Sequence, residues 1–341
     1  MNNKEKSLYI SVAQVLSCLS VVILHVNGNF WSFTGDASWI KANIIECFFY
    51  PAAPIFFMIS GATLLDYRDR YDTKTFLKKR IKRTLLPFIV WSFIGLLYQL
   101  LKNSLDITSL TTKDVASSII NTKYVPVYWF FIPLFTIYIL IIMISLVPKD
   151  GRKKVFYYFS LFSIVLSIIN VLFSFIGIQF NGALSNGLVS YSVLVLLGYC
   201  ISTFPIERRQ RVLIYILGLL GFLLHVLGTM YLSLDKGEIV NVFKGYTNFP
   251  CVLHTVAIFT LIKYLPYERF PKITRIVEYL SQATLGVYLI HWFLIDTIIS
   301  HLKMIDLTRL SYKTIAVVVV FSLSVLLTKL IKRVPIIRNI C

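Results

Sequence analysis

A histidine and two carboxylates lie in or at the edge of long apolar stretches of the chain, where ionisable side chains are rare. His25 lies in the stretch LYISVAQVLSCLSVVILHVNGNFW (8–31), Glu46 opens the next apolar stretch, and Asp296 lies in a late one, five residues after His291. A histidine with a carboxylate partner is the usual arrangement for general-base catalysis, because the carboxylate fixes the tautomer and raises the basicity of the ring. These residues predict proton-transfer chemistry, with His25 as the base and Glu46 or Asp296 as its orienting partner.

The same residues also have a simpler interpretation. A single histidine at a helix end is often an interfacial hydrogen-bonding residue, and Glu46 and Asp296 could be exposed to water at loop edges. His225 and His254 are more readily explained as structural residues than as catalytic ones. Spacing alone does not decide between these interpretations.

The stretches that carry these residues are long enough to cross a membrane. The chain has 341 residues, of which 57% are hydrophobic, and its mean hydropathy is +0.75. About 20 apolar residues in a helix cross roughly 30 Å of hydrocarbon. The sequence predicts an all-α integral membrane protein, a bundle of about ten transmembrane helices in a single domain covering 1–341. The predicted spans are 8–27, 44–65, 84–101, 125–147, 155–176, 187–203, 212–232, 249–265, 283–300 and 313–331.

Charge sets the expected orientation of these spans. The formal net charge is +18, with 34 Lys and Arg residues against 16 Asp and Glu. The basic residues lie in short tracts between apolar stretches, which argues against nucleic-acid binding and for topology signals. If both termini are cytoplasmic, most of these residues fall on the cytoplasmic side, as expected for ten spans. The first span resembles a signal peptide but is too long and lacks a small-residue cleavage site, so we expect it to be retained.

The cysteines and the remaining composition give no sign of a metal site or a bound cofactor. The five cysteines are scattered and lack paired metal-ligand spacing. We expect them to be inert packing residues; they are Cys18, Cys47, Cys200, Cys251 and Cys341.

Five segments, in this order and spacing, make the chain resemble the membrane-bound acyltransferase family 3, whose bacterial members acylate cell-surface glycans. The likeness covers almost the whole length. The matching segments are VVILHV, with His25; PIFFMISG (54–61); KKRIKRTLLPFIVWS, with Arg80, Arg83, Pro87, Trp91 and Ser92; VYWFFIPLFTIYIL, with Trp129, Phe130 and Tyr138; and LGVYLIHWFLI, with Tyr288 and His291.

The resemblance implies an enzyme that moves an acyl group from a thioester, acetyl-CoA or a related acyl-CoA, to a sugar hydroxyl. His25 is then the base that activates the hydroxyl. Arg80 and Arg83, in a tract expected to face the cytoplasm, are the candidates for binding the CoA phosphates, because an arginine fork pairs well with phosphate. The alternative is that this basic tract only sets topology. The acceptor is a cell-surface glycan or its lipid-linked precursor, and the expected location is the bacterial plasma or inner membrane.

One position departs from the family pattern. The family has an arginine eleven residues before the first-span histidine, and Gln14 occupies that position here. This is about 16 Å of helix rise from His25. Glutamine cannot supply the charge or the forked donors of arginine at this donor-binding position. Either another basic residue substitutes, or the donor is handled differently, or this member has lost transferase activity.

Two other classes of protein share some of these features. A transporter or flippase for a lipid-linked sugar or polymer would have similar spans and intramembrane polar residues, and it would not need an arginine at position 14. However, the chain shows neither an internal repeat nor paired broken helices, which are frequent in transporters. A noncatalytic scaffold for surface-polymer assembly is a third possibility, for which the sequence offers no positive sign.

Overall fold

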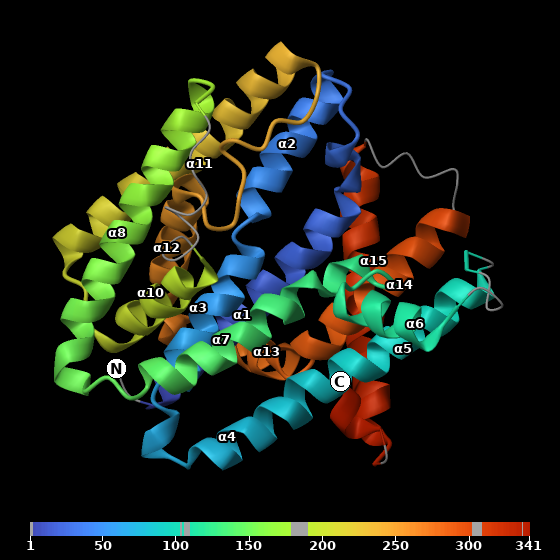
Figure 1. Ribbon diagram of the computed structural model, residues 1–341, viewed down its shortest axis with the longest axis horizontal. Coiled ribbons are helices and arrows are strands. Elements are labelled where there is room, and N and C mark those ends of the chain that lie inside the picture. Colours follow the sequence, from blue (N-terminus) through green and yellow to red (C-terminus); the bar gives the residue numbers. More distant parts are fainter. Residues whose placement is uncertain (1–2, 103, 106–109, 179–189, 302–308, 336) are drawn as a thin grey trace.

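The computed structural model describes residues 3–102, 104–105, 110–178, 190–301, 309–335 and 337–341 (Figure 1). The prediction of an all-helical protein is confirmed for these residues, which contain no strand. The main helices are α1 (Asn3–Val26), α2 (Ala37–Phe49), α3 (Ala52–Leu64), α4 (Thr73–Arg80), η3 (Ile81–Leu85), α5 (Leu86–Leu101), α6 (Thr112–Ile120), η5 (Pro126–Phe130), α7 (Phe131–Ile144), α8 (Lys149–Phe175), α10 (Tyr191–Thr203), α11 (Arg208–Lys236), α12 (Phe249–Lys263), α13 (Pro271–Ser281), α14 (Thr284–His301) and α15 (Leu310–Arg333).

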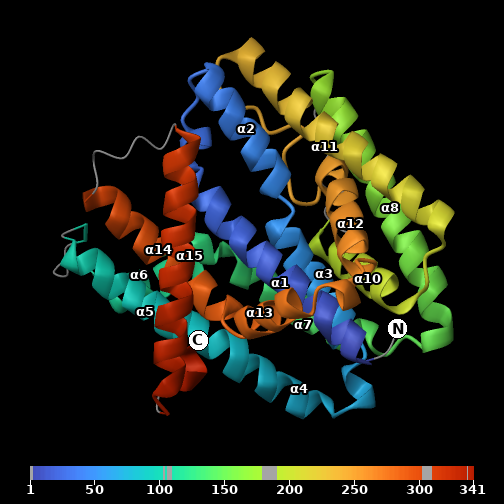
Figure 2. The same cartoon turned by 180° about the vertical axis from the view of Figure 1, so that it is seen from behind.

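Helix α1, which carries Gln14 and His25, runs through the middle of the bundle in both views (Figures 1 and 2). It packs against α2, α3, α12, α13, α14 and α15. Most of its side chains are therefore held by other helices, and a polar residue on α1 is positioned by several parts of the chain at once.

Seven helical segments are long and apolar enough to cross a membrane, which indicates a multi-pass membrane protein. Three shorter apolar helices, 191–203, 249–263 and 284–298, lie at the positions of the predicted sixth, eighth and ninth spans. A helix thus occurs at each predicted span, although residues 187–189 of the sixth lie outside the described residues. That all ten cross the membrane, with both termini cytoplasmic, stays a prediction.

The second span begins earlier than the sequence analysis predicts and is broken in the middle. The apolar segment runs from Ala37 to Asp69, whereas the predicted span begins at 44. Pro51 lies between α2 and α3, where its ring and missing N–H disfavour an uninterrupted helix.

The carboxylate of Asp36 caps α2 by accepting a hydrogen bond from the Trp39 N–H at 2.8 Å. This backbone donor lowers the pKa of Asp36. Glu46 is a buried residue of α2, on the N-terminal side of the break at Pro51.

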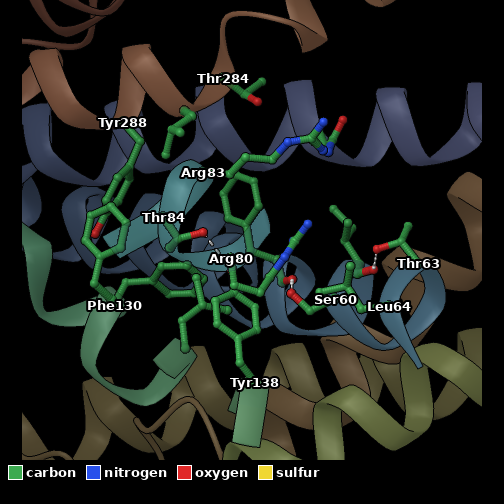
Figure 3. A pocket seen from close by; sticks show the side chains of 16 residues that line it. Ser60, Thr63, Leu64, Arg80, Arg83, Thr84, Phe130, Tyr138, Thr284 and Tyr288 are labelled. Atoms are coloured by element: carbon green, nitrogen blue, oxygen red, sulfur yellow. Dashed lines mark hydrogen bonds between the residues drawn. The ribbon is translucent and has the colours of Figure 1, made fainter. Parts of the chain in front are cut away.

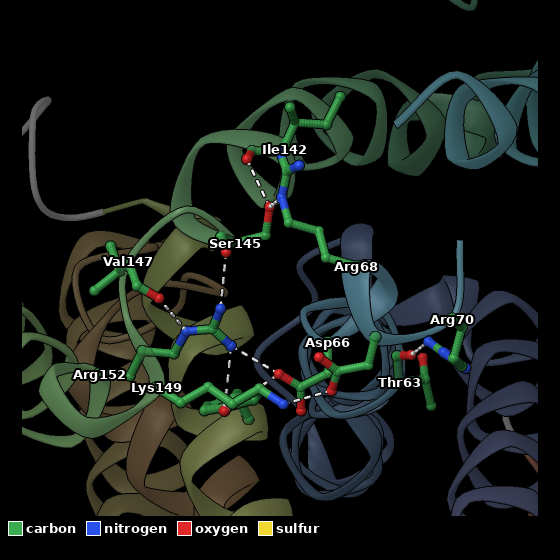
Figure 4. A network of polar contacts seen from close by, with 11 residues as sticks. Thr63, Asp66, Arg68, Arg70, Ile142, Ser145, Val147, Lys149 and Arg152 are labelled. Atoms are coloured by element: carbon green, nitrogen blue, oxygen red, sulfur yellow. Dashed lines mark hydrogen bonds and ion pairs between the residues drawn. The ribbon is translucent and has the colours of Figure 1, made fainter. Parts of the chain in front are cut away.

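A buried arginine joins three helix ends on the side of the protein predicted to be cytoplasmic (Figure 4). Arg152 is only 4% exposed. It donates hydrogen bonds to the carbonyl oxygens of Val147 and Ser145, each at 2.8 Å, and to Asp66 Oδ1 at 2.7 Å. Among the basic residues that sequence reasoning assigned to topology, this one is therefore part of the packing that joins α3, α7 and α8.

Candidate active site

Two cavities lie back to back in the bundle and share part of their lining. The arginine cavity, about 250 Å³, is lined by residues of α1, α3, α4, η3, η5, α7 and α14, including Gln14, Ser60, Arg80, Arg83, Thr84 and Tyr138. The histidine cavity, about 170 Å³, is lined by residues including His25, Trp31, Glu46, Trp129 and Tyr246. Phe56, Phe130 and Tyr288 line both. Three aromatic side chains thus form the wall between the cavities.

The arginine cavity is positively charged. Arg80 and Arg83 both reach into it from one turn of the α4–η3 segment (Figure 3). The Arg80 guanidinium lies over the Tyr138 ring, 5.6 Å from its centroid, and Arg83 is exposed, so the cavity opens at that residue. Among the residues that the structure describes, no Asp or Glu is in its lining. Two cations without a lining carboxylate make the cavity suited to an anionic ligand, because an arginine fork pairs with phosphate or carboxylate oxygens.

Arg80 and Arg83 are three residues apart, which places their side chains next to each other on the helix surface. Residues 81–85 form a π-helix between α4 and α5. Such turns are rare and occur often at functional sites, because the extra residue changes the face on which the following side chains lie. Thr84 of this turn is buried in the cavity wall, where its hydroxyl and that of Tyr138 lie 3.0 Å apart in a hydrogen bond.

The histidine cavity combines His25 with aromatic rings. Tyr246 stacks on Trp129, with centroids 5.1 Å apart and an interplanar angle of 16°, and on Tyr50, at 4.3 Å and 9°. Burial raises the pKa of Tyr246, which lies in the loop before α12, so its hydroxyl keeps its proton. Trp31 is also in the lining. Flat aromatic faces with a carboxylate nearby can hold a ring that has both apolar faces and hydroxyl groups.

The ring of a second histidine lies against that of His25. The ring centroids of His25 and His291 are 5.2 Å apart. His291 is 0% exposed, and its Nδ1 lies 2.7 Å from the Tyr288 carbonyl and 3.1 Å from that of Val287. A ring nitrogen facing carbonyl oxygens carries the proton, which leaves Nε2 of His291 as an acceptor. Nε2 has no hydrogen-bond partner among the described residues.

Glu46 lines the same cavity as His25, but its carboxylate contacts Asn27 and Lys244. Its carboxylate accepts a hydrogen bond from the Asn27 amide at 3.3 Å and lies 3.5 Å from Lys244 Nζ. Lys313 donates to Asn27 Oδ1 at 2.6 Å. All four side chains are buried. The Lys244 ammonium in this network compensates the negative charge of the Glu46 carboxylate. A role for Glu46 as a partner of His25 stays a prediction.

Asp296 lies away from both cavities. Its carboxylate pairs with Lys102 at 2.6 Å and accepts a hydrogen bond from the Tyr98 hydroxyl at 2.7 Å, and the side chain is 36% exposed. The bond to the carboxylate raises the pKa of Lys102. Asp296 is absent from the lining of the histidine cavity, so the structure does not bring it together with His25.

On α14 the structure therefore places His291, and not Asp296, beside His25, and a role for Asp296 stays a prediction. His291 and Tyr288 are three residues apart, which places them on one face of the helix, and both occur in the segment LGVYLIH that carries the family resemblance. That spacing could have indicated His291. Lys244 and Tyr246 lie in a loop with no recognisable pattern, and no sequence signal pointed to them.

A comparison of the chain with known protein families agrees with this architecture. A family model described as an acyltransferase domain matches residues 7–329, which includes every residue that lines the two cavities. Searches among curated proteins and among solved structures gave no match. The match covers nearly the whole chain and confirms the resemblance, so the protein belongs to the acyltransferase 3 family.

Proposed function

We propose that the protein transfers an acetyl or similar acyl group from acyl-CoA to a hydroxyl of a cell-surface glycan or its lipid-linked precursor. The observation that carries this proposal is the contact between the two cavities at Phe56, Phe130 and Tyr288. A cationic cavity suits the donor, and a cavity with a histidine and aromatic rings suits the acceptor. The thioester can then meet the hydroxyl at the shared wall.

Donor binding is assigned to the arginine cavity. The phosphates of acyl-CoA are anionic, and Arg80 and Arg83 provide fork-shaped donors for them. The positive-inside rule favours a cytoplasmic position for this basic segment, on the side where acyl-CoA is made. Gln14 lines the same cavity. Gln14 therefore lacks a charge in a cavity that already holds the two guanidinium groups of Arg80 and Arg83. This supports the alternative in which another basic residue takes the place of the family arginine.

His25 then acts as the general base. It accepts the proton of the acceptor hydroxyl as the oxygen attacks the thioester carbonyl carbon. The new C–O bond forms, the C–S bond breaks, and the proton passes from His25 to the departing CoA sulfur. A hydroxyl is a weak nucleophile at neutral pH, so removal of its proton during attack accounts for a large part of the rate.

The direct test is acyl transfer by the purified protein in lipid nanodiscs containing the bacterial cell-envelope glycan or lipid-linked sugar fraction, with acetyl-CoA labelled in the acetyl group. We expect label to leave CoA and to appear on the acceptor. The variant Gln14→Arg is measured beside the unmodified chain. An increase in rate would show that the charge at position 14 limits the reaction. If neither protein binds or consumes labelled acetyl-CoA, the proposal is wrong, and a transporter or an inactive family member is the better assignment.

Loss of either cavity arginine is expected to weaken donor binding. We expect Arg80→Gln and Arg83→Gln each to raise the KM for acetyl-CoA about tenfold, because a hydrogen bond to a charged group contributes roughly 1.5–3 kcal/mol. Lys79→Gln is the matched control: it removes one charge from the same helix, but the Lys79 ammonium lies over the Tyr71 ring, 3.7 Å from its centroid, and is outside the cavity lining. Equal effects of all three substitutions would favour a role in topology only.

A further inference from the structure

The outer face of the segment that carries Arg80 and Arg83 forms a second ligand-binding surface. Helix α4 and the start of α5 lie along one edge of the molecule (Figures 1 and 2). A shallow groove of about 570 Å³ is lined by residues of α4, η3 and the start of α5. We call it the lysine groove. It is lined by Lys74, Leu77, Lys78, Ile81, Lys82 and Leu86.

The cations of the groove outnumber the acidic groups near them, since Asp72, which caps α4, lies close to Lys74. Lys74, Lys78 and Lys82 are spaced four residues apart, which places their ammonium groups along one face of the helix, and all three are exposed. In the described part of the chain, no Asp or Glu is in the lining of the groove itself. The other cations of the segment face elsewhere, since Lys79 lies over Tyr71 and Arg80 over Tyr138. The groove therefore presents three positive charges together to a ligand.

The rest of the lining is apolar and continues along the span. Leu77, Ile81 and Leu86 are 41%, 53% and 41% exposed. Farther along α5, Ile89, Phe93 and Leu97 are also exposed. In a chain that crosses a membrane, such a stripe lies against lipid acyl chains. Lysine side chains at the end of the stripe reach toward the headgroups.

We propose that the lysine groove binds an anionic phospholipid, with the phosphate on the lysines and the acyl chains on the apolar stripe. The cations suit an anionic head, and the continuous apolar surface suits long aliphatic chains. A soluble phosphate compound would use only the first feature. Lipid bound here also packs against the π-helical turn, whose other face presents Arg83 and Thr84 to the arginine cavity.

The experiment measures lipids retained by the full-length protein. The protein is exchanged into detergent with equal amounts of phosphatidylglycerol and phosphatidylcholine, and the bound lipids are counted by native mass spectrometry. The groove variant is Lys74→Gln/Lys78→Gln/Lys82→Gln. The control variant, Lys154→Gln/Arg208→Gln/Arg209→Gln, removes three charges from exposed positions outside the groove, also on the side predicted to be cytoplasmic.

We expect the unmodified chain and the control to retain one phosphatidylglycerol that the groove variant loses, with at least a tenfold preference over phosphatidylcholine. Circular dichroism and size-exclusion profiles are compared first, to establish that both variants are folded. Equal retention by the groove variant, or no preference for the anionic lipid, would overturn the proposal. Displacement of the lipid by CoA in the unmodified chain would overturn it too, since the groove would then take CoA phosphates. None of these readouts depends on acyl transfer.

Discussion

Replacement of His25 by alanine is expected to lower acyl transfer by a factor of about 10² to 10⁴, the range that a positioned general base contributes. His25 lies in the lining of the histidine cavity, next to the wall that this cavity shares with the arginine cavity. The imidazole is the base assigned to accept the hydroxyl proton there, so its removal leaves the attacking oxygen without that base. The measurement is the rate of label transfer from acetyl-CoA in nanodiscs, with the KM for acetyl-CoA determined separately. We expect that KM to change little, because donor binding is assigned to the other cavity.

His291 provides a second arm of this experiment. Its ring contacts that of His25, and its Nδ1 is held by backbone carbonyls. We therefore expect His291→Phe to lower kcat and shift the pH profile of the reaction, while the KM for acetyl-CoA stays near that of the unmodified chain. Near-normal transfer by a folded His25→Ala protein would remove His25 from the mechanism. An unchanged pH profile for His291→Phe would show that His291 only fills space.

Replacement of Gly61 by alanine is expected to destabilise the protein by about 2–3 kcal/mol or more, the range for an overpacked core. A Cβ on Gly61 of α3 would lie 1.8 Å from the Val195 carbonyl oxygen of α10, and a Cβ on Gly198 of α10 would lie 2.1 Å from the Met58 carbonyl oxygen of α3. The two helices touch through their backbones, so neither can yield by a change of rotamer. The greater helix propensity of alanine, roughly 1 kcal/mol, does not offset this.

Gly151→Ala is the matched control for this substitution. Gly151 lies in the first turn of α8, and a Cβ there would meet no atom within 4 Å. Thermal unfolding in detergent, followed by loss of helical circular dichroism, is the measurement. We expect a clearly lower melting temperature for Gly61→Ala and an unchanged or slightly higher one for Gly151→Ala. Equal melting temperatures for the two variants would contradict the close contact between α3 and α10.

Much of the helical layout could be predicted because it depends on local chemistry. An apolar stretch of about 20 residues reads as a transmembrane helix wherever it occurs, since the backbone polar groups must be bonded internally in hydrocarbon. Each predicted span coincides with a helix, long or short. Two departures from regular helices are also local features of the chain: the break at Pro51 and the π-helical turn at 81–85.

The candidate site could be predicted only in part. Sequence pattern indicated His25, Arg80 and Arg83, which line the two cavities. It could not show that the Glu46 carboxylate pairs with Lys244, that the Asp296 carboxylate pairs with Lys102, or that Arg152 is buried. In each case the partner lies on another helix or loop, and the contact depends on how the two elements are rotated and tilted.

The class of protein, its family and the residue types available for acyl transfer follow from the order of residues along the chain. Which of these residues meet depends on how the helices pack. His25 and His291 are 266 positions apart, and they come into contact because α1 packs against α14 in the centre of the bundle. The periodicity of a single helix shows which of its residues share a face, but the helix that faces them is selected by packing across the whole chain.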